Sequence, residues 1–425
     1  MTKQPDYAQV LDVAAEAGHI LLENGAEISR VEDIMSRISA HYGVDTGNFF
    51  ILSNGIFTTG HPERVSKAGG QASTYANVEF IPIRGIQLSK VVAVNRLSYD
   101  IAADKIDLAG ARARLKEIRS SAIKPVWERM LGIALGAAGF CGVFIGSWID
   151  IASAFVVGLL LSFFMVFVSG RYLSKIVGGV CNALLSSILC IAFWRIGFGN
   201  SLANIIIGAV MPLIPGVPFV NGVRDLANSD YLAGLTRLTD AMLTFATIAI
   251  GVSLSFMLDG VLHGGVIELS GMTESPQTYS LWWQAVAGFV GTLAFAILFG
   301  IDREHYMPAG VIGALGWVAY LVMYRYAGTT PPVSAAVASA FLCLLARIAA
   351  IPFRSPAQVF IISGIIPLVP GAGIFWFTYY LTASQFDLST QSGFMAIKVA
   401  VAIVLGIVLT MELPQRLFSR KRRTH

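Results

Sequence analysis

Charged residues are scarce in this chain of 425 residues. Asp, Glu, Lys and Arg together make up 13% of it, whereas 55% of its residues are hydrophobic. A soluble globular protein usually carries about 25% charged residues. Half of these charges lie before residue 125, in less than a third of the chain, and beyond Trp127 they retreat to short loops. The deficit excludes a protein that is soluble along its whole length. It predicts a polar domain over residues 1–125 followed by a large membrane domain.

Several chemical signatures are missing as well. The first ten residues, MTKQPDYAQV, contain no apolar run, so no cleaved signal is expected. The spacing of the four cysteines matches no zinc site or disulfide framework, and we expect small buried hydrophobes at Cys141, Cys181, Cys190 and Cys343. No nucleotide-binding motif occurs. We therefore expect no cofactor, no metal and no nucleic-acid partner, and any transport would draw on an ion gradient.

Long apolar runs dominate the rest of the chain. A helix that crosses a bilayer needs about 20 mostly apolar residues. Five segments qualify before the polar linker 261–281, near 129–148, 151–169, 176–197, 202–220 and 238–258. Five more follow it, near 283–301, 308–324, 333–353, 357–380 and 393–413. The sequence thus predicts a mostly α-helical, multi-pass membrane protein with five spans in residues 126–260 and five in residues 282–425.

Basic residues predict the orientation of these spans. Cytoplasmic loops carry an excess of Lys and Arg. If the N-terminal domain is cytoplasmic, the tail RLFSRKRRTH also lies inside, and few basic residues lie outside. The inside loops then hold Arg171, Lys175, Arg224, Arg237, Arg303 and Arg354, and the outside loops hold Arg195 and Arg325. We therefore expect both termini in the cytoplasm and an even number of spans.

Two similar proline-rich phrases interrupt the fourth span of each half. MPLIPGVPF begins at Met211, and IPLVPGAGIF begins at Ile366. An offset of 155 residues pairs Pro212 with Pro367, Pro215 with Pro370, Gly216 with Gly371, Trp127 with Trp282, Phe140 with Phe295, Gly158 with Gly313, and Gly251 with Gly406. This predicts an internal duplication. Because five spans is an odd number, the second half must run upside down relative to the first, as in many secondary transporters.

The breaks themselves need a physical reason. A proline inside a helix costs about 3 kcal/mol, and irregular backbone at membrane depth is tolerated only against protein or water. Glycine lets a ligand approach the backbone, and the free N–H groups of the half-helix that follows would suit a carboxylate. The expected substrate-binding residues are Pro212, Pro215, Gly216, Pro218, Asn221, Pro367, Pro370, Gly371 and Gly373. The plainer alternative is two kinked helices that only pack against their neighbours.

Ionisable side chains within the spans are few, and such residues are functional candidates. Asp240, near the inner end of the fifth span, could bind a proton or a substrate amine. Lys398 and Arg347 could pair with a carboxylate, although each could equally extend to the membrane interface. We favour Asp240 as the partner of a proton or an amine.

The N-terminal domain is predicted to be a small α+β domain. Two amphipathic helices, over 6–25 and 26–43, precede a hairpin signal at Asn54-Gly55. A third strand over 74–84 and two more helices, over 88–104 and 108–120, follow. Catalytic side chains are available in principle at His19, Glu27, His41, Ser53, Asn54 and His61. No nucleophile elbow, P-loop or metal-ligand spacing accompanies them, so we assign no catalytic residue and expect a cap that assists folding, oligomerisation or gating.

Three stretches carry a resemblance to a known family. They are LLENGAEISRVEDIMSRISAHYGVD followed by SNGIFTT, then PLIPGVPFVNGVRDLANSDYLAGLTRL, and then PLVPGAGIF. Together they resemble the ThrE threonine/serine exporter family, whose split relatives are the YjjP/YjjB pairs. The chain would be a fused form, with the larger partner over about 1–260 and the smaller over about 280–425.

This resemblance implies a secondary exporter in the inner membrane that is driven by the proton-motive force. The substrates would be small carboxylate-bearing metabolites, namely threonine and serine, or succinate for the split pairs. The matching motif positions are Pro215, Gly216, Pro218, Asn221, Asp225, Pro370 and Gly371. Gly373 and Trp376 replace the proline and asparagine in the second half, so the two breaks are not expected to be equivalent.

Other functions stay open at this point. A channel or passive facilitator would need no coupling ion. A membrane-tethered hydrolase or a metabolite sensor would act through residues 1–125. The residues do not choose between an amino acid and a dicarboxylate, and a homo-oligomer is possible.

Overall fold

The computed structural model describes residues 7–44, 47–60, 75–82, 85–122, 124–265, 267, 269, 280–353 and 355–414. The chain divides into two compact units. The N-terminal unit contains Met1–Ile123, Asn221–Arg237 and Phe299–Asp302. The membrane unit contains Lys124–Val220, Leu238–Leu298 and Arg303–His425. Residues 221–237, which lie among the apolar segments in sequence, therefore belong to the N-terminal unit.

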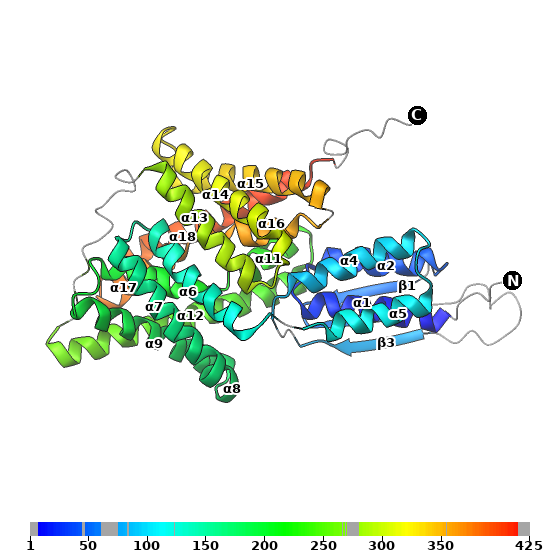
Figure 1. Cartoon of the computed structure of the whole chain (residues 1–425), viewed down its shortest axis with the longest axis horizontal. Coiled ribbons are helices and arrows are strands. Elements are labelled where there is room, and N and C mark those ends of the chain that lie inside the picture. The colour runs from blue at the N-terminus through cyan, green and yellow to red at the C-terminus, as the bar shows by residue number, and fades with distance from the viewer. Residues whose placement is uncertain are drawn as a thin grey trace, which may run out of the picture. The chain divides into compact units, whose positions relative to one another are not determined.

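The N-terminal unit combines helices with one antiparallel sheet. Its elements are α1 (Tyr7–Glu23), α2 (Ile28–His41), β1 (Gly47–Leu52), β2 (Gly55–Gly60), β3 (Tyr75–Phe80), α4 (Leu88–Ala102) and α5 (Leu108–Ser120). The strand order is β1-β2-β3, and Figure 1 shows the helices running along the strands. The apolar stripe of α1, which includes Val10, Val13, Ala17 and Leu21, is fully buried. Four large apolar side chains of the strands are exposed, those of Phe50, Phe57, Val78 and Phe80.

The local turn signals are close to their expected places. Gly25, with φ of 86°, follows the end of α1 in the left-handed conformation that glycine favours. In the hairpin, Leu52 pairs with Gly55, so the turn is Ser53-Asn54 and not the predicted Asn54-Gly55. Gly55 is instead the first residue of β2. A Cβ there would lie 3.1 Å from the Glu79 carbonyl oxygen, so β3 approaches too closely for a larger residue.

The first half of the apolar region contains five long helical segments. They are α6 (Val126–Val143), α7 (Trp148–Phe164) with the π-turn η1 (Met165–Ser169) and α8 (Gly170–Tyr172), α9 (Lys175–Arg195), α10 (Leu202–Val210) with η2 (Met211–Leu213) and α11 (Gly216–Ala227), and α12 (Tyr231–His263). The second half contains α13 (Leu281–Leu298), η4 (Arg303–His305) with α14 (Tyr306–Arg325), α15 (Pro331–Phe353), α16 (Gln358–Gly364) with η5 (Ile366–Leu368) and α17 (Gly371–Thr382), and α18 (Phe386–Met411).

Most of these helices are long enough for a bilayer. In the described ranges, nine helices are long and apolar enough to cross a membrane, and the bent pair Leu202–Leu213 and Gly216–Ala227 makes ten if it counts as one span. This confirms the prediction of a mostly helical, multi-pass membrane protein. Three parts of the chain discussed above lie outside the described residues: Arg354, residues 270–279 of the linker, and the basic tail.

The elements repeat along the chain at the offset found in the sequence. The starts of α6 and α13, of η2 and η5, of α11 and α17, and of α12 and α18 are each 155 residues apart. Equivalent glycines also make equivalent contacts. A Cβ at Gly158 would meet Ala137, and a Cβ at Gly313 would meet Thr292, which is 155 residues after Ala137.

Helices α6 and α13, which are equivalent under this offset, lie side by side and run in opposite directions. Gly132, early in α6, faces Ile297 and Leu298 at the end of α13, whereas Gly142, late in α6, faces Ala287 near its start. Between these ends, the equivalent rings of Phe140 and Phe295 meet edge to face with centroids 5.5 Å apart. Small residues at this seam allow the close approach.

Candidate functional site

The first helix break is a short, internally hydrogen-bonded turn. Ile214 N–H donates to the Met211 carbonyl at 3.1 Å, and Gly216 N–H donates to the Ile214 carbonyl at 2.9 Å. Pro215 then precedes the first residue of α11. The two helical pieces meet at an angle of 61°. The proline ring prevents the normal i→i−4 bond, so the chain turns here.

The second break has the same backbone pattern with a smaller change of direction. Val369 N–H donates to the Ile366 carbonyl at 3.1 Å, and Gly371 N–H donates to the Val369 carbonyl at 2.7 Å. Pro370 is the N-cap of α17. Residues Gln358–Thr382 nevertheless form one candidate span. The two breaks therefore share a hydrogen-bond plan and differ in bend.

The glycine amides at the breaks are not free, contrary to our expectation. Gly216 and Gly371 both donate to the carbonyl two residues earlier, because the proline-containing turn folds each N–H back onto that oxygen. The amides that lack an acceptor within their own helix are those of the following residues. They are Val217 in α11, and Ala372 and Gly373 in α17.

The two breaks contact each other reciprocally. A Cβ at Gly216 would lie 3.0 Å from Ile366 Cδ1, and a Cβ at Gly371 would lie 2.7 Å from Ile214 Cδ1 and closer still to the Met211 sulfur. Ile366 is equivalent to Met211 under the 155-residue offset. Such exchanged contacts are typical of two-fold symmetry. A larger side chain at either glycine would push the breaks apart.

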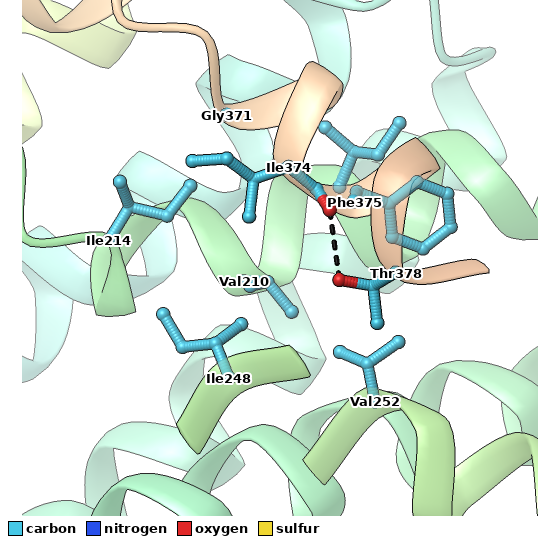
Figure 2. Close-up of a pocket in the computed structure, with 9 residues that line it drawn as sticks. Val210, Ile214, Ile248, Val252, Gly371, Ile374, Phe375 and Thr378 are labelled. Atoms are coloured by element: carbon cyan, nitrogen blue, oxygen red, sulfur yellow. Dashed lines mark hydrogen bonds between the residues drawn. The ribbon is translucent and has the colours of Figure 1, made fainter. Parts of the chain in front are cut away.

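A small apolar cavity lies beside the breaks. Nine residues line it: Ile207, Val210, Ile214, Ile248, Val252, Gly371, Ile374, Phe375 and Thr378. Figure 2 shows α17 on one side of the cavity, with Val210, Ile214, Ile248 and Val252 opposite. The single hydroxyl, of Thr378, donates to the Ile374 carbonyl at 2.9 Å and is already satisfied. The cavity of about 10 Å³ holds about one water molecule, so an amino acid would fit only after the helices separate.

The predicted site residues differ in how close they come to this cavity. Gly371 lines it, and Pro212 and Pro367 lie in the adjoining turns η2 and η5. Pro218 follows in the first turn of α11. A Cβ at Gly373 would lie 3.1 Å from Ala396 of α18, so this glycine serves the packing of α17 on α18.

Three predicted charged residues are not among those that line the cavity. Arg347 donates to the carbonyls of Thr410, Met411 and Leu413, and so caps the C-terminal end of α18. Asp240 forms an ion pair with Lys175, and its side chain is 45% exposed. Lys398 is exposed on α18 and has no ion-pair partner within the part of the chain that the structure describes.

Asp225 belongs to a buried ionic cluster inside the N-terminal unit. Its carboxylate lies 3.0 Å from the Arg237 guanidinium, and Arg237 also donates to the Ala26 carbonyl at 2.9 Å. Arg224 lies 2.5 Å from the Glu27 carboxylate. The four charged residues are between 1% and 8% exposed. We refer to Glu27, Arg224, Asp225 and Arg237 as the charge cluster. Asn221, 5% exposed, lies in the same unit.

The charge cluster corrects the expected place of two basic residues. Arg224 and Arg237 are not in loops, because α11 and α12 extend past the predicted ends of their spans and bury both side chains. The adjacent charges of Arg224 and Asp225 in an apolar phrase were the available signal. The cavity residues from α12 gave no such signal, because Ile248 and Val252 are ordinary apolar residues in the sequence.

A second, polar pocket lies on the N-terminal unit. Its volume is about 410 Å³, and it is lined by Asp12, Glu16, His19, Glu79, Phe80, Arg112 and Arg119. His19 Nδ1–H donates to Glu79 at 3.0 Å, and Arg119 donates to His19 Nε2 at 3.2 Å. The hydrogen bond from His19 lowers the pKa of Glu79 below its ordinary value. This lining contains no serine, threonine or cysteine that could act as a nucleophile.

Two family models match consecutive parts of the chain. The ThrE family model, described as "Putative threonine/serine exporter", matches residues 12–259, and the model "Threonine/Serine exporter, ThrE" matches residues 284–412. The "Threonine/serine exporter" of Corynebacterium glutamicum is 25% identical over all of this chain and 85% of its own length. No solved structure matches the chain significantly.

Two further relatives carry different names. The "Probable threonine/serine exporter" of Mycobacterium tuberculosis is 22% identical over 94% of this chain and 75% of its own length. The "Probable succinate transporter subunit YjjP" of Escherichia coli is 24% identical over 59% of this chain and 95% of its own length. Because the first family model alone covers more than half of the residues, the chain belongs to the ThrE family.

Proposed function

We propose that this membrane protein is a secondary exporter of small amino acids, threonine and serine, and not an enzyme. The observation that carries the proposal is the pair of helix breaks that contact each other reciprocally beside a closed cavity. Substrate sites of transporters typically form between discontinuous helices at a repeat interface. The names of the relatives from Corynebacterium glutamicum and Mycobacterium tuberculosis support the substrate class.

The architecture that we propose is two inverted five-helix repeats with interrupted fourth helices. The antiparallel contact of α6 with α13 and the 155-residue offset of the elements support inversion. In this arrangement residues 126–260 and 282–425 form the repeats, and residues 261–281 form an extracytoplasmic linker between them. Residues 1–125 would form the cytoplasmic α+β domain, and both termini would lie on the cytoplasmic side of the inner membrane.

Substrate would bind where the two breaks meet. Rocking of one repeat against the other would open the cavity, and the first-turn amides of Ala372 and Gly373 would then be available to a carboxylate. The glycines at 216 and 371 permit the breaks to close again after release. Succinate is the alternative substrate, supported by the name of the relative from Escherichia coli. A dicarboxylate needs a second cation at the site.

The proton-motive force is the proposed energy source. Two acids are candidates for coupling: Asp225, which is 1% exposed beside Arg237, and Asp240, which is paired with Lys175. The buried acid is the better candidate, because its charge state changes its surroundings more strongly in a low dielectric. A homo-oligomer is also proposed; the size of the purified protein in detergent would test it.

Counterflow in liposomes tests the function directly. The full chain would be reconstituted and loaded with unlabelled threonine, and uptake of labelled threonine, serine and succinate would be followed at imposed pH gradients. Saturable, gradient-dependent uptake of threonine and serine is the expected result. Uptake that does not saturate would indicate a channel. An absence of uptake for all three compounds would contradict the transport proposal, and hydrolysis of amino-acid esters would favour an enzyme.

A further inference from the structure

The charge cluster contains an arginine whose buried partner comes from a distant part of the chain. Arg224 lies in the last turns of α11, the half-helix that begins at the first break. Its ion-pair partner, Glu27, lies between α1 and α2. By contrast, Asp225 and Arg237 pair across the short connection between α11 and α12. One pair therefore fixes a local hairpin, whereas the other joins two separate elements of the N-terminal unit.

The contact between Glu27 and Arg224 is close but poorly satisfied. The two groups approach to 2.5 Å, yet the buried Glu27 Oε2 accepts no well-aligned hydrogen bond within the described residues. The same holds for Asp225 Oδ2 in the other pair of the cluster. Two buried carboxylates outside the cluster are better held. Asp150 accepts from the amides of Ser147, Asn200 and Ser201, and Asp259 accepts two hydrogen bonds from Arg195. A carboxylate with unmet hydrogen-bonding capacity is easier to displace.

The Glu27 side chain also has a second arginine within reach. It is the N-cap residue of α2, but its side chain makes no capping hydrogen bond. Its other oxygen lies 3.5 Å from Arg30, one turn along the same helix, whose side chain is 20% exposed. A change of rotamer would therefore move the Glu27 charge from a buried arginine to one that reaches solvent.

A buried arginine released in this way would select a carboxylate. Guanidinium groups bind carboxylates in a planar, two-point geometry. Arg224 and Arg237 are the buried basic side chains of the described ranges; every lysine and every other arginine there is at least partly exposed. Arg237 is already held by Asp225 and the Ala26 carbonyl. Arg224 is thus the buried arginine whose acidic partner has a second, partly exposed arginine within reach, and it lies two helical turns from Gly216 on the same helix.

We propose that Arg224 is the first binding site for the carboxylate of the transported organic acid, and that Glu27 occupies it between transport cycles as a built-in competitor. The inference rests on the proposed export function and gives the N-terminal unit a direct part in it. The ligand class is any small organic acid, and an amine or alcohol without a carboxylate would not displace Glu27. Displacement forms and breaks no covalent bond.

The test compares two acids of the same cluster, which a purely structural network would treat alike. Glu27→Gln removes the competitor, so it should lower the KM for threonine counterflow several-fold. Asp225→Asn leaves Arg237 without its charged partner and should raise KM or lower the rate. Asp33→Asn, an exposed acid of α2 that pairs with Arg37, is the matched control and should change neither. Inhibition by L-threoninol, which lacks the carboxylate, should be the same in Glu27→Gln and the unchanged protein.

A double variant identifies the residue through which Glu27 acts. In the Arg224→Gln background, Glu27→Gln should no longer lower KM, because the two substitutions act on one contact. The inference is overturned if Glu27→Gln leaves KM unchanged or raises it in a folded protein, or if its gain persists without Arg224.

A binding measurement separates this inference from the transport proposal. The thermal stability of the purified full chain would be followed with added L-threonine or succinate. A larger ligand-induced shift in Glu27→Gln than in the unchanged protein supports the site, even if liposomes show no flux and the transport proposal fails. No ligand-induced shift in any variant, together with no change in KM, overturns it.

Discussion

The half-helices α11 and α17 share a backbone and differ in chemistry. Both begin at a glycine after a proline-rich turn, and both have 12 residues. The last turns of α11 carry Asn221, Arg224 and Asp225, whereas the equivalent positions of α17 carry Trp376, Tyr379 and Tyr380. One half-helix thus ends in buried charges, and the other ends in a cluster of aromatic rings.

Each half-helix is held at that end by a different segment. Arg224 pairs with Glu27 of the N-terminal unit. Tyr379 accepts a hydrogen bond from the Leu269 amide at 2.8 Å and donates to the Ile267 carbonyl at 3.2 Å, both in the linker between the halves. The two breaks thus share a backbone turn, whereas the ends of the two half-helices differ in chemistry and in the segment that holds them. The charged end suits selection of an organic acid, and the aromatic end suits closure.

The largest expected effect comes from adding a large side chain where the two helix breaks contact each other. Gly371→Leu and Gly216→Leu should abolish flux, because a Cβ alone at Gly371 would meet Ile214 at 2.7 Å and at Gly216 would meet Ile366 at 3.0 Å. Overpacking typically costs about 1–3 kcal/mol even for smaller insertions. Counterflow and size-exclusion elution would be measured together. Gly136→Ala is the control, since the nearest atoms to a Cβ at that position would lie 3.6 Å away, an ordinary van der Waals distance. Unchanged flux in a folded Gly371→Leu protein would contradict the site.

The next effect separates the two candidate coupling acids. Asp225→Asn should abolish the response of uptake to an imposed pH gradient and lower the thermal midpoint, since breaking a buried ion pair costs about 3–5 kcal/mol. Asp240→Asn should change the pH response little, because Asp240 is 45% exposed and a surface pair is worth about 0–1 kcal/mol. The reverse order of effects, with gradient dependence lost only in Asp240→Asn, would move proton coupling to the α9–α12 pair.

The aromatic end predicts a smaller, local effect. Tyr379→Phe removes the acceptor of the Leu269 amide, and a hydrogen bond of this kind contributes about 0.5–1.5 kcal/mol. Amide exchange at Leu269 should become roughly fivefold faster by hydrogen-exchange mass spectrometry. Tyr380→Phe is the matched control on the next residue. Equal exchange in both variants would show that the hydroxyl of Tyr379 does not hold the linker.

Much of this architecture could be predicted because membrane helices and recurring phrases leave strong patterns in a sequence. The uncharged runs identified each span, with ends that differ from the helix bounds by up to seven residues, and the offset of 155 residues recurs in the helix starts. The strands and helices of residues 7–120 followed from alternation and helical periodicity. The hairpin turn was one residue off, because Gly55 pairs with Leu52 as the first residue of β2. Its tight contact with the β3 backbone involves a residue 24 positions away.

The site was harder to predict because it depends on contacts between distant residues. Proline and glycine identified the breaks, but their facing partners Ile214 and Ile366 are ordinary apolar residues. Arg347 and Asp240 attracted attention as charges in apolar segments, whereas the structure uses Arg347 to cap a helix. Glu27 could not be connected with Arg224 from sequence, because nearly 200 residues separate them and only the fold brings them together.

The smallest expected effect lies in the polar pocket of the N-terminal unit, away from both half-helices. The hydrogen bond from His19 lowers the pKa of Glu79, so the folded state favours the carboxylate over the protonated acid. This contribution to stability is fully present above the ordinary pKa of a glutamate and is lost as the pH falls through the lowered value. The thermal midpoint of Glu79→Gln should therefore depend less on pH between 7 and about 4 than that of the unchanged protein. Glu16→Gln, in the same pocket, is the control. A change of counterflow in Glu79→Gln would indicate that the polar pocket takes part in transport. The charged end of α11 would then not be the sole contribution of the N-terminal unit to transport.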